Sequence, residues 1–277
     1  MTTIVRDVIR TVRAWPIFAF YIAATLIVAT IIGLITVNII DLGMQHFGEA
    51  AHRSHDVAYG ALFTTLVVGV VVQLRHPERN VAGMVMALIP SASLLLAAVL
   101  VDDIDRVFEF NPLRYAAAVA SVTVLLHPSG RGFFRSFRLT AVSWPMLAVV
   151  AVAAIPLLSF ASDNIALQRD VTDMHTFMGH YGFMAALAYT IIAVGALASM
   201  RPAGWRLTVW VAALLAAVLG ATSLLYPDAA SSLATEWALA SLAWAAAFAA
   251  LAVRSHDAPT TTAPAAPSEP AHLAHAG

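Results

Sequence analysis

Apolar residues form eight long stretches along the chain, separated by short polar segments. A transmembrane α-helix needs about 20 consecutive apolar residues to cross about 30 Å of hydrocarbon. The expected spans are Ile17–Ile40, Val57–Leu74, Val81–Val101, Phe110–Leu126, Leu139–Ala161, Phe183–Met200, Leu207–Tyr226 and Ala238–Val253. The pattern therefore predicts an all-α membrane protein with eight transmembrane helices.

The composition supports this fold class and excludes several functions. Hydrophobic residues make up 60% of the chain and charged residues 11%, whereas about 25% of the residues of a soluble domain are charged. The absence of cysteine removes disulfides and thiolate metal ligands. All fifteen basic residues are arginine, so the chain lacks the lysine that a retinal Schiff base requires.

The arginines concentrate in alternate loops, which predicts the orientation of the chain. Cytoplasmic loops of membrane proteins are enriched in basic residues, and an even number of spans leaves both termini on the same side. We therefore expect both termini in the cytoplasm of a multi-pass protein of the cell membrane, with the lipid bilayer as its environment and no nucleic-acid partner. The arginines assigned to the cytoplasmic side are Arg6, Arg10, Arg13, Arg75, Arg79, Arg131, Arg135, Arg138, Arg201, Arg206 and Arg254.

The two halves of the chain share a pattern of polar residues. At an offset of 122 residues, Asp41 aligns with Asp163, and Tyr59 with Tyr181. An internal repeat with the same orientation in both halves implies an axis along the membrane normal. We expect two tandem four-helix bundles, residues 1–126 and 139–253, joined by a cytoplasmic linker at 127–138. The polar, proline-rich residues 254–277 are expected to form a disordered cytoplasmic tail.

Histidines and carboxylates gather in two outer loops at corresponding places in the two halves. Residues three apart lie on one face of a helix, so the spacing of Glu49, His52 and His55 allows them to converge on one ion. Imidazole ligands suit iron, copper, zinc and nickel. We predict a site for haem or a transition metal ion on the outer face. Its cofactor-binding residues are His52, His55, His175 and His180, with His46 and Glu49 as additional metal ligands.

The predicted site implies a short distance between the histidines of the two loops. Because metal ligands must lie about 2 Å from a shared ion, His52 or His55 should lie within about 10 Å of His175 or His180. The alternative is that these are ordinary histidines of solvated loops, since the two loops do not match residue for residue.

Three functions remain open at this point. The histidine loops favour a metal- or haem-binding membrane protein with a redox or cofactor-handling role, whether or not it is an enzyme. The repeat and the helix prolines Pro90, Pro145 and Pro156 favour a small-molecule transporter with broken helices. The third is a non-catalytic subunit of a larger membrane complex, with other proteins as partners. A proton relay is disfavoured because the expected spans contain no ionisable residue at mid-depth.

Overall fold

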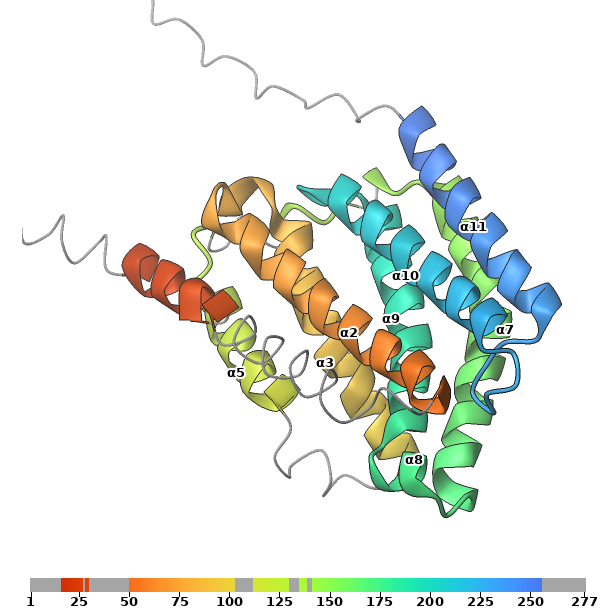
Figure 1. Ribbon diagram of the computed structural model, residues 1–277. Coiled ribbons are helices and arrows are strands. Elements are labelled where there is room, and N and C mark those ends of the chain that lie inside the picture. The colour runs from red at the N-terminus through yellow and green to blue at the C-terminus, as the bar shows by residue number, and fades with distance from the viewer. Residues whose placement is uncertain are drawn as a thin grey trace, which may run out of the picture.

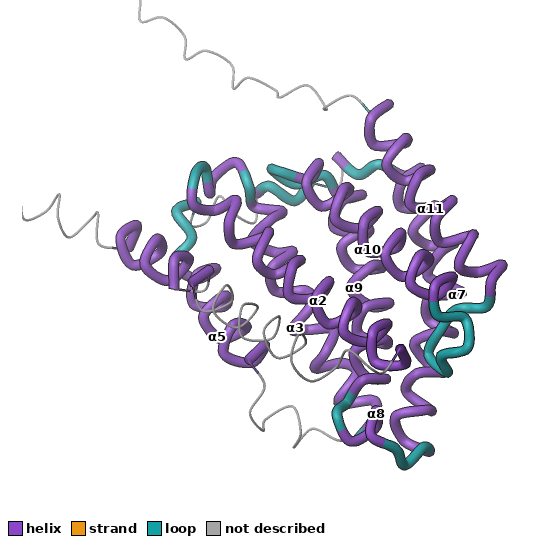
Figure 2. The backbone as a smooth tube through the Cα atoms, in the orientation of Figure 1, coloured by secondary structure: helices purple, strands orange, loops and turns teal. Residues whose placement is uncertain are grey.

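The computed structural model describes residues 16–26, 28–29, 50–102, 112–129, 135–138 and 141–255, and the regular structure within these ranges is helical (Figures 1 and 2). A short N-terminal helix covers Pro16–Leu26. The helices that follow are α2 (Ala50–Val71), η1 (Val72–Leu74), η2 (Pro77–Arg79), α3 (Val81–Val101), α5 (Pro112–Leu125), α7 (Trp144–Asp170), α8 (Met174–Phe177), α9 (His180–Met200), α10 (Trp205–Leu225) and α11 (Thr235–Arg254).

Six of the described helices are long and apolar enough to cross a membrane: the helical segment Arg53–Leu74, α3, α7, α9, α10 and α11. They correspond to the expected second, third and fifth to eighth spans, and they indicate an integral membrane protein. In the expected first span, the structure describes a helix over Pro16–Leu26 and, beyond it, residues 28–29. The expected fourth span contains α5, which has 14 residues. The count of eight spans therefore stays a prediction.

Two helices extend beyond the expected spans on the side of the histidines. Helix α2 begins at Ala50, seven residues before Val57, so its first turns include residues expected in a loop. Helix α7 has 27 residues and continues to Asp170. At 1.5 Å per residue it is about 40 Å long, which exceeds the hydrocarbon thickness. Its last turns are stabilised by buried amides, such as Asn164, which donates to the carbonyl of Phe160 (2.9 Å).

Helix α9 lies at the centre of the described bundle and packs against α2, α3, α7 and α10 (Figure 1). Small residues on α9, such as Ala185, Ala188 and Gly195, are buried and allow its neighbours to approach closely. Helices α7 and α11 lie at the periphery and expose apolar side chains, including Ile155 and Leu239. In a membrane, these faces contact lipid.

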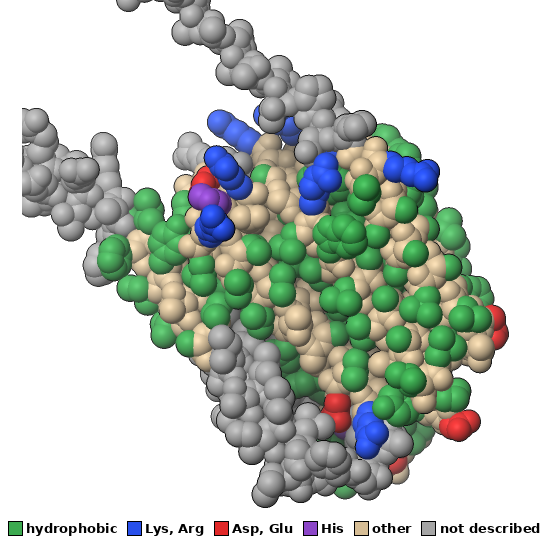
Figure 3. All heavy atoms as spheres, turned by 45° about the horizontal axis from the view of Figure 1, so that its top comes forward, with side chains coloured by type: hydrophobic (Ala, Val, Ile, Leu, Met, Phe, Trp, Pro, Cys, Tyr) green, Lys and Arg blue, Asp and Glu red, His purple; other side chains and the backbone are tan. Residues whose placement is uncertain are grey.

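At the end of the bundle opposite the histidines, the turn between α2 and α3 contacts the turn between α9 and α10. The N–H of Ala82 donates to the carbonyl of Ala203 (2.8 Å). Gly204 has a φ of +83°, and a Cβ there would lie 2.9 Å from the carbonyl oxygen of Arg79. This close contact brings the arginines that follow α2 and α9, such as Arg79 and Arg201, to one end of the molecule, and Figure 3 shows most of the visible arginine side chains at one end.

Candidate metal centre

Two distant parts of the sequence bring three histidines together at the other end of the bundle. His55 lies near the start of α2, His175 lies on the short helix α8, and His180 is the first residue of α9. Helix α8 begins because Asp173 accepts a hydrogen bond from the N–H of Thr176 (2.8 Å), as an N-cap residue does. Gly179, with a φ of +74°, allows the sharp turn into α9 that brings His180 beside His175.

The three imidazoles form one cluster. A ligand nitrogen of each residue lies within 4.8 Å of those of the other two. The ring centroids of His55 and His175 are 5.1 Å apart, those of His55 and His180 are 5.1 Å apart, and those of His175 and His180 are 5.8 Å apart. His55 and His180 are 3% and 6% exposed, so the cluster is largely shielded from solvent. The expected proximity of the two histidine groups is confirmed for His55.

An ionised carboxylate orients His175. Asp173 Oδ2 lies 3.2 Å from His175 Nδ1 and accepts a hydrogen bond from the hydroxyl of Tyr181 (3.0 Å). The backbone N–H of Thr176 is the main group that holds the pKa of Asp173 down, at about 2, and hydrogen bonds from the side chains of Thr176, Tyr181 and His175 add to this effect. Asp173 is therefore charged at neutral pH and positions the His175 ring through Nδ1.

A hydroxyl group from a third part of the chain contacts His55. Ser231, in the loop between α10 and α11, is 1% exposed, and its Oγ lies 2.7 Å from His55 Nε2. The ring of Tyr181 packs edge-on against His55 with the centroids 5.6 Å apart. The cluster is thus held by residues from α2, α8, α9 and the α10–α11 loop.

The remaining predicted ligands are not part of this described cluster. His46 and Glu49 lie outside the described residues, and His52 belongs to α2 without a described side chain. Asp173 was not among the predicted ligands, and its local signal in the sequence is that aspartate is a preferred N-cap residue. The role of Ser231 had no local signal, because it lies 176 residues from His55.

The transporter interpretation expected broken helices at the prolines. Instead, α3 continues through Pro90 and α7 through Pro156. The expected linker at 127–138 is described at residues 127–129 and 135–138, and the expected tail lies outside the described residues from residue 256 onward.

Comparison with known protein families, with curated proteins and with solved structures finds no match for this chain.

Proposed function

We propose that this chain is an integral membrane protein that binds a transition metal ion through His55, His175 and His180 at the outer face of the cell membrane, in a redox or cofactor-handling role. The observation that carries the proposal is the convergence of three histidines whose ligand nitrogens lie within 4.8 Å of one another. Histidines of a solvated loop have no reason to converge in this way, and two of these three are almost fully buried.

The distances suit an ion after a small adjustment. Bonds of 2.0–2.1 Å in a tetrahedral site separate the ligand nitrogens by about 3.4 Å. Nitrogens at most 4.8 Å apart therefore need to approach by roughly 1 Å or slightly more, a movement that side-chain rotation can supply. Three protein ligands leave a fourth position for water or a substrate, the arrangement of catalytic rather than purely structural zinc sites.

The hydrogen bonds of the histidine rings to Asp173 and Ser231 also support a metal site. Histidine ligands commonly donate their second ring N–H to a carboxylate or another oxygen, which fixes the tautomer and the orientation of the ring. Asp173 is positioned to accept from His175 Nδ1, which assigns Nε2 as the metal ligand. The Ser231 hydroxyl can accept from His55 Nε2, which assigns Nδ1 to the ion.

A bare ion fits the ring arrangement better than haem does. Two axial histidines of a haem point towards the iron from opposite faces of the macrocycle. The rings of His55 and His180 instead stack at an interplanar angle of 29°, and His175 lies beside both. A macrocycle between these rings would need the cluster to separate.

The membrane orientation follows from the distribution of charge. Exposed arginines such as Arg75 and Arg79 lie at the end opposite the cluster, whereas exposed acids such as Asp163 and Glu236 lie at the end of the cluster. In Figure 3 most of the visible basic side chains lie at one end and most of the acidic ones at the other. The positive-inside rule then assigns the cluster to the outer side. We also propose eight spans with both termini in the cytoplasm.

We infer in addition that the two halves are tandem repeats. Helix α2 pairs with α3 as α9 pairs with α10, and α3 contacts α9 as α10 contacts α2. A twofold axis along the membrane normal, between α2 and α9, would produce these paired contacts. The histidine cluster and the hydrogen bond between Ala82 and Ala203 would then lie near the two ends of that axis.

Metal titration of the purified protein tests the proposed site. After removal of bound metal, Zn²⁺ and Cu²⁺ are titrated by calorimetry, and the metal retained after dialysis is measured by mass spectrometry. We expect about one ion per chain, and a loss of at least 100-fold in affinity in each of His55→Ala, His175→Ala and His180→Ala. The control is His76→Ala, because His76 is exposed at the opposite end of the bundle.

Equal metal binding by the wild type and the three cluster variants would refute the site. If the wild type binds no stoichiometric metal and shows no haem absorption, the function as a subunit of a larger complex becomes the better explanation. In that case the cluster variants should still assemble with their partners.

A further inference from the structure

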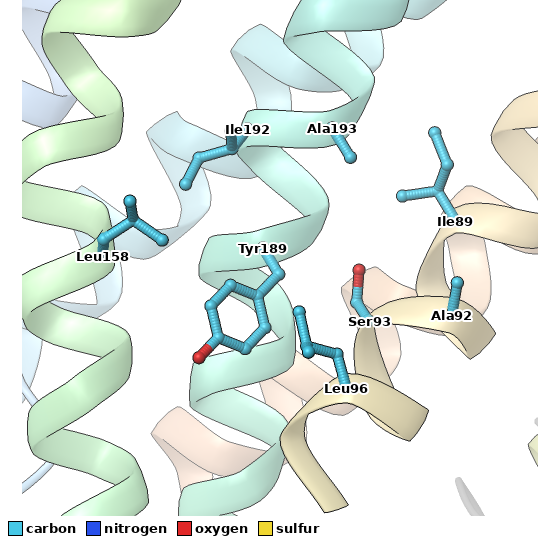
Figure 4. A pocket seen from close by; sticks show the side chains of 8 residues that line it. All are labelled: Ile89, Ala92, Ser93, Leu96, Leu158, Tyr189, Ile192 and Ala193. Carbon is cyan, nitrogen blue, oxygen red and sulfur yellow. The ribbon is translucent and has the colours of Figure 1, made fainter. Parts of the chain in front are cut away.

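A lateral groove lies between α3, α7 and α9, away from the histidine cluster. It has a volume of about 320 Å³, within the range of ligand-binding pockets. Figure 4 shows Ile89 and Leu96 of α3 and Ile192 of α9 around it, with Leu158 of α7 on the opposite side. Leu96 and Leu158 are 45% and 50% exposed. Since all three helices are candidate membrane spans, the groove opens towards the hydrocarbon of the bilayer.

Prolines and small residues lie beside the groove. Pro90 lies within α3, next to the groove residue Ile89, and Pro156 lies within α7, two residues before Leu158. Each proline removes one main-chain hydrogen bond and its ring crowds the preceding turn. Ala92 of α3 and Ala193 of α9 line the groove with small side chains.

One buried hydroxyl group in the groove makes no hydrogen bond within the described part of the chain. Ser93 is 5% exposed and lines the groove, and its hydroxyl is directed into the space between α3 and α9 in Figure 4. Thr65 and Thr190, also inside spans, each donate to the carbonyl four residues earlier, whereas Ser93 does not. A polar group without a partner is costly in hydrocarbon, so Ser93 is suited to donate to a ligand.

The depth of this hydroxyl selects the class of ligand. Ser93 is 12 residues from the start of α3 and eight from its end, about 18 and 12 Å along the helix axis. Tyr189, whose ring also lines the groove, lies near the middle of α9. Phospholipid carbonyls remain near the interface, about 15 Å from the bilayer centre. An acceptor at mid-depth must therefore belong to a molecule that dissolves in the hydrocarbon.

We propose that this groove binds an isoprenoid quinone. The isoprenoid chain lies along the apolar wall formed by Ile89, Leu158 and Ile192. A ring carbonyl oxygen of the quinone accepts a hydrogen bond from the Ser93 hydroxyl, and the Tyr189 ring lies beside the quinone ring. This site is separate from the metal centre and does not depend on it.

Binding of decylubiquinone to the full chain in lipid nanodiscs tests the proposal. The bound quinone is measured after rapid gel filtration by its oxidised-minus-reduced absorbance, with empty nanodiscs subtracted. We expect saturation at about one molecule per chain. Loss of one hydrogen bond in Ser93→Ala should weaken binding about fivefold, and Ala193→Leu, which fills the groove, should abolish it. The control is Ser91→Ala on the same helix, because Ser91 does not line the groove.

The competitor is decanol, which has a similar chain and no carbonyl group. If decanol displaces decylubiquinone at equal concentration, the groove holds any apolar chain and the proposal is wrong. The proposal is also wrong if the wild type shows no saturable binding above empty nanodiscs, or if Ser93→Ala and Ser91→Ala bind equally well. Because none of these variants touches the histidines, metal titration of the same samples reports on the metal centre separately.

Discussion

Replacement of Asp173 by asparagine tests whether the charge beside His175 supports metal binding. In the wild type, the N–H of Thr176 donates to Asp173 Oδ1 at 2.8 Å. Asparagine is nearly the same size as aspartate and also serves as an N-cap, so its amide oxygen can still accept this hydrogen bond. The substitution therefore preserves the start of α8. It removes the negative charge that accepts from His175 Nδ1 at 3.2 Å and from the Tyr181 hydroxyl at 3.0 Å.

The expected loss of metal affinity follows from the role of Asp173 as the hydrogen-bond partner of a histidine ligand. Loss of the outer hydrogen-bond partner of a histidine ligand lowers metal affinity about 10- to 100-fold. This corresponds to about 1.4–2.7 kcal/mol of binding free energy. We expect Asp173→Asn to remain within that range, because the three nitrogen ligands are retained. His175→Ala, which removes a ligand, should lose more.

The assay is calorimetric titration with Zn²⁺ at fixed pH, together with circular dichroism to verify that helix content is unchanged. Asp163→Asn provides the matched control, since Asp163 is an exposed aspartate on α7. The reasoning is refuted if Asp173→Asn binds Zn²⁺ as tightly as the wild type while His175→Ala does not. The same holds if Asp163→Asn weakens binding as much as Asp173→Asn.

Two further predictions concern packing and orientation. A Cβ at Gly69 would lie 2.5 Å from a backbone oxygen of α3, whereas a Cβ at Gly60 would have no atom within 4 Å. Gly69→Ala should therefore destabilise the protein by about 1–3 kcal/mol. In detergent its melting temperature should fall while that of Gly60→Ala does not, and equal melting temperatures would contradict the close helix contact. Since the chain contains no cysteine, Glu236→Cys and Arg254→Cys can each be labelled singly in intact cells with a membrane-impermeant maleimide. We expect labelling of Glu236→Cys only, because position 236 is expected on the outer side. Labelling of Arg254→Cys only would refute the proposed orientation of the chain in the membrane.

The sequence alone determined the membrane environment and the general position of the site. Runs of about 20 apolar residues have few structural alternatives, because backbone polar groups in hydrocarbon must be satisfied within a helix. Six of the expected spans are present as long apolar helices. The sequence also predicted that His52 or His55 would lie near His175 or His180, because histidines gather in two loops that the expected repeat places together.

The tertiary structure decided which residues form the cluster and what supports them. The packing of α2 against α9 places the ring of His55 against that of His180, a contact that residue spacing along α2 does not specify. The contact of Ser231 with His55 and the groove around Ser93 depend on how helices from both halves pack. A run of about 20 apolar residues indicates that a helix lies in the membrane. The rotation of the helix about its axis and the identity of its neighbours are set by side-chain packing between helices. This packing involves residues that are distant in the sequence, so a single stretch of sequence does not specify it.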